Sequence, residues 1–172
     1  MMGLIVSPLA EVPMVVEALR PSHMVTLLDP GHQIERPPSI APSAWLRLDV
    51  HDIHEPTPVM TAPNQDAVQR LLAFAEGWDE AAPMLIHCHA GISRSTASAY
   101  IVACARLPHI DEMAIAMQLR EASPVAFPNR ALVAHADQIL GREGRMVAGV
   151  EAMGHTDMNA WQVPFQFWPI QG

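Results

Sequence analysis

The segment LIHCHAGISRS, residues 85–95, concentrates side chains that can do chemistry. A thiol, two imidazoles, a guanidinium and two hydroxyls fall within nine residues, directly after an apolar run. Such a set is compatible with a metal site, a redox thiol, an anion-binding turn or an inert strand end. The elements on either side of the segment bear on the choice among them.

The position of the segment between a strand and a helix favours an anion-binding turn. Residues 84–87 start with three apolar residues and are typical of a buried strand, and residues 95–106 are apolar nearly all round, as in a buried helix. A turn at this junction directs backbone N–H groups and the positive helix end at one point. The amides belong to His89, Ala90, Gly91, Ile92 and Ser93. Gly91 gives the loop the freedom in φ that a tight curl requires.

Cys88 is expected at the bottom of this loop, where the helix end, the amides and an arginine all favour thiolate over thiol. Arg94 returns from the helix start, and its planar guanidinium can hold two oxygens of a tetrahedral anion. Cys88 is then an activated nucleophile facing an electrophilic phosphorus. Ser95 can donate a hydrogen bond to the sulfur when it becomes the leaving group. We expect His87 to point away from the anion and fix the loop's shape, and His89 to lie at the pocket rim.

These residues carry a family resemblance. His87, Cys88, Gly91, Arg94 and Ser95 match the HCxxGxxR[ST] loop of the cysteine-dependent protein tyrosine phosphatases, and CHAGISRS looks most like the dual-specificity subgroup. The resemblance extends weakly over residues 25–140, including SPVAFPN at 123–129, which is similar to the segment before the last family helix.

The resemblance implies both a fold and an activity. The implied fold is α/β of the phosphotyrosine phosphatase II type, with a central, mostly parallel sheet of four to five strands flanked by helices. The implied activity is hydrolysis of phosphotyrosine, or of phosphomonoesters with dual specificity, through a cysteinyl-phosphate intermediate and without a metal or other cofactor. Two alternatives stay open: a phosphoprotein-binding pseudophosphatase, and a phosphatase of a non-protein phosphomonoester.

Phosphoester cleavage also requires a proton for the departing oxygen, and a carboxylic acid on a nearby loop is a suitable source. The segment LDVHDIHEP offers Asp49, Asp52 and Glu55. Asp52 lies just beyond a strand at the start of a proline-rich loop, and the family carries its acid on a comparable upstream loop. We expect Asp52 to be the acid, with Asp49, which alternation assigns to the strand, and Glu55 as alternatives.

Asn129 has two candidate roles. The resemblance implies that its segment lies close to the active-site loop, where the side chain would position the attacking water. An asparagine directly before a helical pattern is also a favoured N-cap.

A metal site is the main chemical alternative for the opening segment. The donor atoms for zinc or copper would come from His51, His54, His87, Cys88 and His89. Their spacing is irregular, and Arg94 would repel a cation, so we expect no metal ion. An inert buried cysteine would not require a glycine and an arginine at these spacings.

Apolar runs alternate with helical patterns along the chain, as in a layered α/β domain. Strands are expected at residues 4–6, 25–28, 46–50 and 84–87, helices at 12–19, 64–78, 95–106, 111–121, 129–140 and 142–153, and proline-rich loops at 29–43 and 51–63. Cys104 is expected to pack in the core. Residues 154–172 form an aromatic C-terminal tail that we expect to lie extended on the body, with a dimer contact or a wall of the substrate groove as alternatives.

The composition describes one domain, residues 1–172. The 18 acidic residues outnumber 10 arginines, no lysine is present, and the net charge is -8. Nucleic acid and anionic membranes are therefore not expected as partners, and a phosphorylated protein or small phosphomonoester is. The two cysteines and the lack of a basic, apolar leader favour a cytoplasmic location. The sequence does not fix the oligomeric state.

Overall fold

A five-stranded sheet forms the centre of the computed structural model, which describes residues 3–157 and 159–170. The strands are β1 (Leu4–Pro8), β2 (His23–Leu28), β3 (Trp45–Asp49), β4 (Met84–Cys88) and β5 (Phe165–Phe167). Their order across the sheet is β3-β2-β4-β1-β5. The first four are parallel, and β5 joins β1 antiparallel at one edge. The expected α/β class with a mostly parallel sheet is confirmed.

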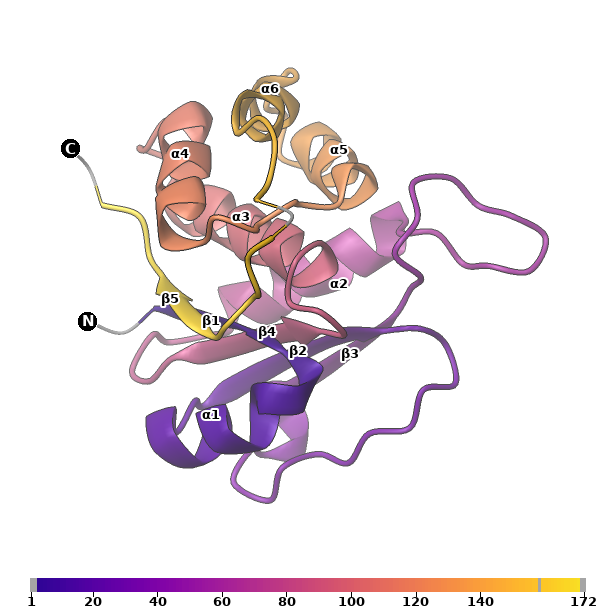
Figure 1. Ribbon diagram of the computed structural model, residues 1–172, viewed down its shortest axis with the longest axis vertical. Coiled ribbons are helices and arrows are strands. Elements are labelled where there is room, and N and C mark those ends of the chain that lie inside the picture. The colour runs from indigo at the N-terminus through magenta and orange to yellow at the C-terminus, as the bar shows by residue number, and fades with distance from the viewer. Residues whose placement is uncertain (1–2, 158, 171–172) are drawn as a thin grey trace.

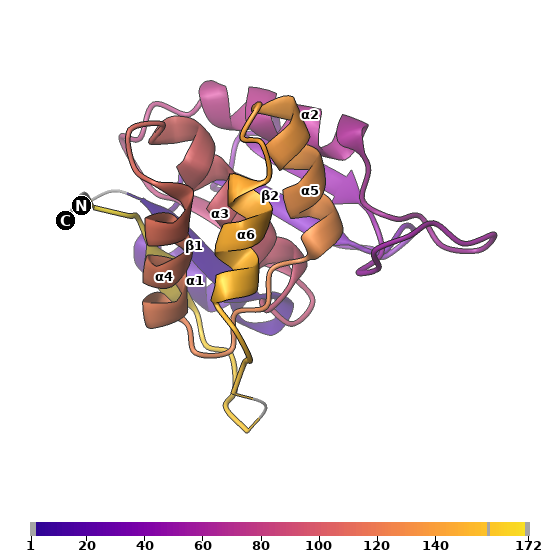
Figure 2. The same ribbon diagram turned by 90° about the horizontal axis from the view of Figure 1, so that it is seen from above.

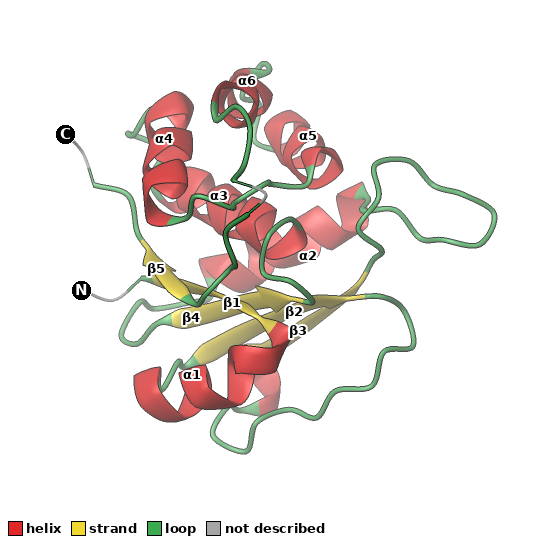
Figure 3. Cartoon of the chain, in the orientation of Figure 1, coloured by secondary structure: helices red, strands yellow, loops and turns green. Residues whose placement is uncertain are grey.

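Helices cover both faces of this sheet. They are α1 (Val12–Leu19), α2 (Gln65–Glu76), α3 (Arg94–Arg106), α4 (Glu112–Ala122), α5 (Arg130–Ile139) and α6 (Arg145–Ala152), with short 3-10 turns η1 (Leu9–Glu11) and η2 (Pro42–Ala44). Figure 1 shows α1 on one face and α2 to α6 on the other, and Figure 3 shows the same layers by element type. Seen from above, α6 lies between α4 and α5 (Figure 2). Helices on both faces explain why the inner strands β1, β2 and β4 are buried along nearly their whole length.

The alternation of side chains along the strands divides the core in two. In β1, Leu4 and Val6 face the larger cluster under α2 to α6, whereas Ile5 faces a smaller cluster with α1. Helix α3 lies in the larger cluster, and its small residues let it pack against β4, β1 and β2. The N-terminus of α3 is thereby fixed at the carboxyl end of the central strand β4.

Cys104 lies inside α3 and is buried, as expected for a core residue. Burial raises the pKa of its thiol to about 12. This cysteine is therefore protonated and unreactive at neutral pH.

Polar side chains begin several helices as the sequence indicates. Asn64, Asp111 and Asn129 each accept hydrogen bonds from backbone N–H groups in the first turn of α2, α4 and α5. Helix α6 is different, because it begins at Arg145 and not at residue 142. The Asp137 carboxylate accepts the N–H groups of Gly144 (2.7 Å) and Met146 (2.8 Å), so a side chain from α5 sets the start of α6.

The aromatic tail was predicted for residues 154–172, of which 158, 171 and 172 lie outside the described residues; part of the described tail lies on the body, and it does more than cover apolar surface. Part of it forms β5, in which Phe167 is buried. Trp168 packs edge-on against Trp78, with ring centroids 5.6 Å apart. Trp161 behaves in the opposite way, since it is 92% exposed.

Two long loops leave the carboxyl edge of the sheet (Figure 1), one after β2 and one after β3. Both are proline-rich, as expected from the sequence. No helix within residues 3–157 and 159–170 is both long and apolar enough to cross a membrane.

Candidate active site

Cys88 is the last residue of β4, and the chain curls over it before α3 begins. We call residues 88–94 the cradle loop. The Cys88 sulfur accepts the N–H of Gly91 at 3.3 Å and lies 3.2 Å from Ser95 Oγ. The residue is 2% exposed, so the sulfur lies at the floor of the loop and not on its surface.

Gly91 is required by the shape of this curl. Its φ is +71°, a region that residues with a Cβ rarely adopt. A Cβ at this position would also lie 2.7 Å from the backbone nitrogen of Pro8 at the end of β1. Any other residue would therefore both strain the loop and push it away from the sheet.

Four carbonyl groups of the cradle loop point outward and accept hydrogen bonds from donors in other parts of the chain. The pairs are His89 O with Leu9 N (3.0 Å), Gly91 O with Gln162 Nε2 (2.6 Å), Ile92 O with Phe127 N (2.9 Å) and Ser93 O with Asn129 N (3.1 Å). These donors come from η1, from the C-terminal tail and from the connection between α4 and α5.

The outward carbonyls determine where the loop's N–H groups point. In a trans peptide, the C=O of one residue and the N–H of the next point in opposite directions. The inward N–H groups are therefore those of Ala90, Ile92, Ser93 and Arg94. Together with the N-terminus of α3 they form a concave set of donors above the Cys88 sulfur, which suits a tetrahedral oxyanion.

Arg94 is the last residue of the cradle loop and is buried, with 6% of the residue exposed. Its Nη1 donates to Asp29 Oδ1 (2.8 Å) and to the carbonyl oxygen of Val50 (2.9 Å). Its Nε is buried and has no partner among the described residues. One side of the guanidinium is therefore anchored, while Nε is left for a ligand, as bidentate binding of an oxyanion requires.

Asp29 was not singled out from the sequence, yet it anchors Arg94. It directly follows β2, at the same sheet edge as Cys88. Parallel strands place their carboxyl ends at one edge of the sheet. An acidic residue directly after a strand therefore indicated, from the sequence alone, a side chain at the edge where Cys88 lies.

Asp52 lies at the rim of the cradle loop. Its Oδ1 accepts hydrogen bonds from Ser93 Oγ (2.7 Å) and from Asn129 Nδ2 (2.9 Å). The other two carboxylates lie elsewhere. Asp49 is exposed and paired with Arg47 at 2.7 Å, and Glu55 lies further along the loop beside Phe127 and Arg130.

Asn129 is the N-cap of α5, and its side chain also reaches the loop that carries Asp52. Its Oδ1 accepts the N–H of Leu132 (3.1 Å) as the N-cap of α5. Its Nδ2 donates to Asp52 and to the carbonyl oxygen of Ile53 (3.2 Å). One side chain therefore links the start of α5 to the loop after β3.

The His87 side chain does not enter the cradle loop; it contacts Thr26 on the neighbouring strand β2. The Trp45 indole can only donate, so Thr26 Oγ1 accepts from Trp45 Nε1 (2.9 Å) and its own proton is left for His87 Nε2 (2.8 Å). The His87 proton is then on Nδ1, which faces the Cys88 backbone without good hydrogen-bond geometry. Burial lowers the pKa of His87 to about 4. The side chain is neutral and braces the strand end from which the cradle loop leaves.

This burial predicts an acid-sensitive fold. In the unfolded chain the His87 imidazole has a pKa of about 6.5, so it binds a proton at a higher pH than in the folded protein. The free energy of unfolding is therefore highest above pH 6.5 and decreases as the pH falls toward 4. Between pH 7.5 and pH 5, His87 alone should lower the free energy of unfolding by about 2 kcal/mol. Urea unfolding of wild type and His87→Gln at both pH values measures this. The variant should lose less stability than wild type, whereas His155→Gln, at an exposed position, should match wild type; equal losses in all three would contradict the assignment.

The histidines considered as metal ligands do not gather around Cys88. His89 is exposed at the outer side of the loop, and His51 accepts the N–H of Thr61 (2.9 Å) within its own loop. Over the described ranges, no three His, Cys, Asp or Glu side chains cluster as metal ligands would.

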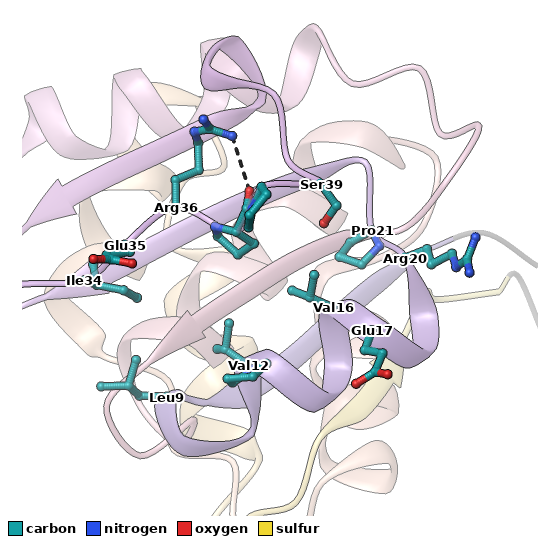
Figure 4. Close-up of a pocket in the computed structure, with 13 residues that line it drawn as sticks. Leu9, Val12, Val16, Glu17, Arg20, Pro21, Ile34, Glu35, Arg36 and Ser39 are labelled. Atoms are coloured by element: carbon teal, nitrogen blue, oxygen red, sulfur yellow. Dashed lines mark hydrogen bonds between the residues drawn. The ribbon is translucent and has the colours of Figure 1, made fainter.

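A separate pocket of about 740 Å³ lies between α1 and the loop after β2 (Figure 4). Its walls are mainly apolar and include Leu9, Val12, Val16, Ile34, Pro37 and Pro38. Arg36 at its margin donates to the carbonyl oxygens of Pro37 (3.2 Å) and Ile40, so it braces its own loop. The pocket contains neither Cys88 nor Arg94 and is distinct from the cradle loop.

Comparisons with known proteins give one kind of match. No protein-family model matches the sequence, and no curated protein matches it. Solved structures do match. The Yvh1 phosphatase domain from Chaetomium thermophilum is 17% identical, with a TM-score of 0.62 and coverage of 83% of this chain and 93% of that one. Human DUSP28 is 18% identical, with a TM-score of 0.60 and coverage of 81% and 94%. The human tyrosine phosphatase-like serine/threonine/tyrosine-interacting protein is 17% identical, with a TM-score of 0.61 and coverage of 82% and 93%. At these identities the likeness establishes architecture, and the chain has the fold of the dual-specificity protein tyrosine phosphatases.

Proposed function

We propose that this protein is a phosphatase that hydrolyses phosphomonoesters, phosphotyrosine in proteins foremost, through a cysteinyl-phosphate intermediate on Cys88. The observation that carries the proposal is the buried Arg94 guanidinium, whose Nε has no partner among the described residues and whose loop also carries four inward N–H groups and the Cys88 thiol. A buried donor without a partner costs free energy unless a ligand occupies it. A phosphoryl group supplies the missing acceptors.

In the first step the three non-bridging phosphoryl oxygens bind the inward N–H groups and the free side of Arg94. The Cys88 thiolate attacks phosphorus in line with the departing oxygen. A sulfur–phosphorus bond forms as the phosphorus–oxygen bond breaks, and the electron pair goes to the leaving oxygen. Asp52, from the rim of the loop, gives that oxygen its proton, so the phenol or alcohol leaves neutral.

In the second step water attacks the cysteinyl phosphate. The Asp52 carboxylate, ionised by the first step, takes a proton from this water, and Asn129 holds Asp52 in place for it. The sulfur–phosphorus bond breaks, its electron pair returns to Cys88, and inorganic phosphate is released. Ser95 Oγ, 3.2 Å from the sulfur, stabilises the returning thiolate by hydrogen bonding.

A phosphoprotein-binding pseudophosphatase is the second candidate. It is favoured by the engagement of Asp52 Oδ1 with two partners, which holds this carboxylate at the loop. One structurally similar protein is itself described as tyrosine phosphatase-like and interacting. A phosphatase of highly anionic head groups is less well supported, because the cradle loop carries only one cationic side chain, Arg94, among the neutral Ala90, Ile92 and Ser93.

Steady-state kinetics with phosphotyrosine peptides, phosphoserine peptides and phosphoinositides test the proposal. We expect the highest kcat/KM for the phosphotyrosine peptide, inhibition by orthovanadate, and no loss of activity with a chelator. Acid-quenched enzyme should carry a phosphoryl group on the tryptic peptide 71–94, which contains Cys88. Tight phosphopeptide binding with no turnover would replace the proposal with the pseudophosphatase, and a preference for phosphoinositides would replace the substrate class.

A further inference from the structure

The C-terminal segment, of which residues 155–157 and 159–167 are described, connects α6 to β5 at the sheet edge and contacts the cradle loop on the way (Figure 1). Several bonds hold it there. The carbonyl oxygen of Pro124 accepts from Asp157 N (3.3 Å) and from Thr156 Oγ1 (3.4 Å), and β5 pairs with β1. The segment is therefore anchored on both sides of its closest approach to the loop.

At this approach Gln162 bridges two parts of the body. Its Oε1 accepts from Ser123 Oγ (2.9 Å), and its Nε2 donates to the carbonyl oxygen of Gly91 (2.6 Å). The two contacts fix which way the amide is turned, because the opposite orientation would set Oε1 against the Gly91 carbonyl oxygen. Ser123 is buried, so its hydroxyl depends on this partner.

Among the outward carbonyl groups of the loop, that of Gly91 depends most on a hydrogen bond to fix its orientation. Glycine has no Cβ to restrict its rotation, so the Gly91–Ile92 peptide plane is the one most able to turn over. Turned over, it would direct a carbonyl oxygen at the bound oxyanion and remove the N–H of Ile92. The other three outward carbonyls are held by backbone N–H groups of Leu9, Phe127 and Asn129, whereas this one is held by a side chain.

We propose that Gln162 is a positioning residue of the phosphate site: it keeps the Ile92 N–H aimed at the phosphoryl oxygens, and the C-terminal segment is thereby part of the catalytic apparatus. The inference rests on the proposed function for its chemistry. It concerns a residue outside the cradle-loop motif, brought to the loop from 71 positions further along the chain.

The test compares Gln162→Met, which keeps the length of the side chain and removes the donor, with Gln166→Met, the same change at an exposed position of the same segment. Loss of a whole oxyanion donor costs about 10²- to 10³-fold, and a peptide plane left free to turn should lose part of that. We expect Gln162→Met to lower kcat/KM about 10-fold and to raise the inhibition constant of inorganic phosphate about 10-fold. Gln166→Met should stay within about twofold of wild type.

A second measurement separates positioning from a general loosening of the loop. On adding inorganic phosphate, the amide resonances of Ile92, Ser93 and Arg94 should shift in wild type. In Gln162→Met the Ile92 shift should be lost while the other two persist. Ser123→Ala, which frees the Gln162 amide to rotate, should weaken the Ile92 shift in the same selective way.

The inference is overturned if Gln162→Met and Gln166→Met bind phosphate equally, or if all three amide shifts vanish together. Wild type that binds phosphate but does not turn over substrate would refute the proposed function alone, because the amide shifts do not depend on catalysis. Wild type whose loop amides do not respond to phosphate would refute both.

Discussion

Replacing Cys88 with serine should abolish turnover of an aryl phosphate, by about 10⁴-fold or more, while leaving phosphate binding within about threefold of wild type. The binding groups explain the split. In the proposed site, oxyanion affinity comes from Arg94 and from the inward N–H groups of the cradle loop, and the substitution changes none of these groups. A serine hydroxyl is a far weaker nucleophile than a thiolate, and the thiol's Ser95 partner cannot activate it because it is not a base. Initial-rate assays and isothermal titration with phosphate provide the two measurements.

The chain offers a matched control in its other cysteine. Cys104→Ser makes the same atomic change inside α3, where the thiol is buried and its pKa is raised to about 12. This variant should keep wild-type kcat and lose only stability, because a buried hydroxyl costs more than a buried thiol. Full activity in Cys88→Ser, or equal loss in both variants, would exclude Cys88 as the nucleophile.

The sequence predicted the strand, turn and helix around Cys88 because these elements follow one another within residues 84–106. Their residue types indicate each element locally, although donors from distant positions then hold the carbonyl groups of the loop. Gly91 was informative for the same reason, since a positive φ is a property of the residue itself.

The groups that orient the loop could not be predicted as readily, because they come from distant positions. The contact of Gln162 with the loop could not be predicted from its residue type, since a glutamine in an irregular tail is usually solvated. Asp29 had a weak signal in its place after a strand, and Asp137 had none, although its carboxylate determines where α6 begins. In each case the contact depends on how separate elements pack together, and periodicity and propensity do not predict that packing.

The tail shows a further limit of sequence patterns. Four aromatics indicated that it packs on the body, and Phe167 and Trp168 do so. The antiparallel pairing of β5 with β1 was not predicted as such, because three residues are too few for a clear alternation.

Replacing Asp52 with alanine should lower kcat by about 10²- to 10⁴-fold for substrates with poor leaving groups, such as alkyl phosphates or phosphotyrosine peptides. The loss should be far smaller for p-nitrophenyl phosphate, whose phenolate leaves without a proton. This dependence on the leaving group is the diagnostic measurement, because a merely structural role for Asp52 would slow all substrates alike.

Two control variants separate the candidate acids. Asp49→Ala removes an exposed carboxylate whose partner is Arg47, and Glu55→Ala removes one beside Phe127 and Arg130, so neither should alter the leaving-group dependence. If Asp49→Ala or Glu55→Ala slowed only the substrates with poor leaving groups, and Asp52→Ala did not, the proton donor would have to be reassigned. Asn129→Ala adds a graded test, since loss of its 2.9 Å bond leaves Asp52 with Ser93 as its remaining partner at Oδ1. A less well held carboxylate spends less time at the leaving oxygen, so this variant should show the same leaving-group dependence in weaker form, by about 10-fold.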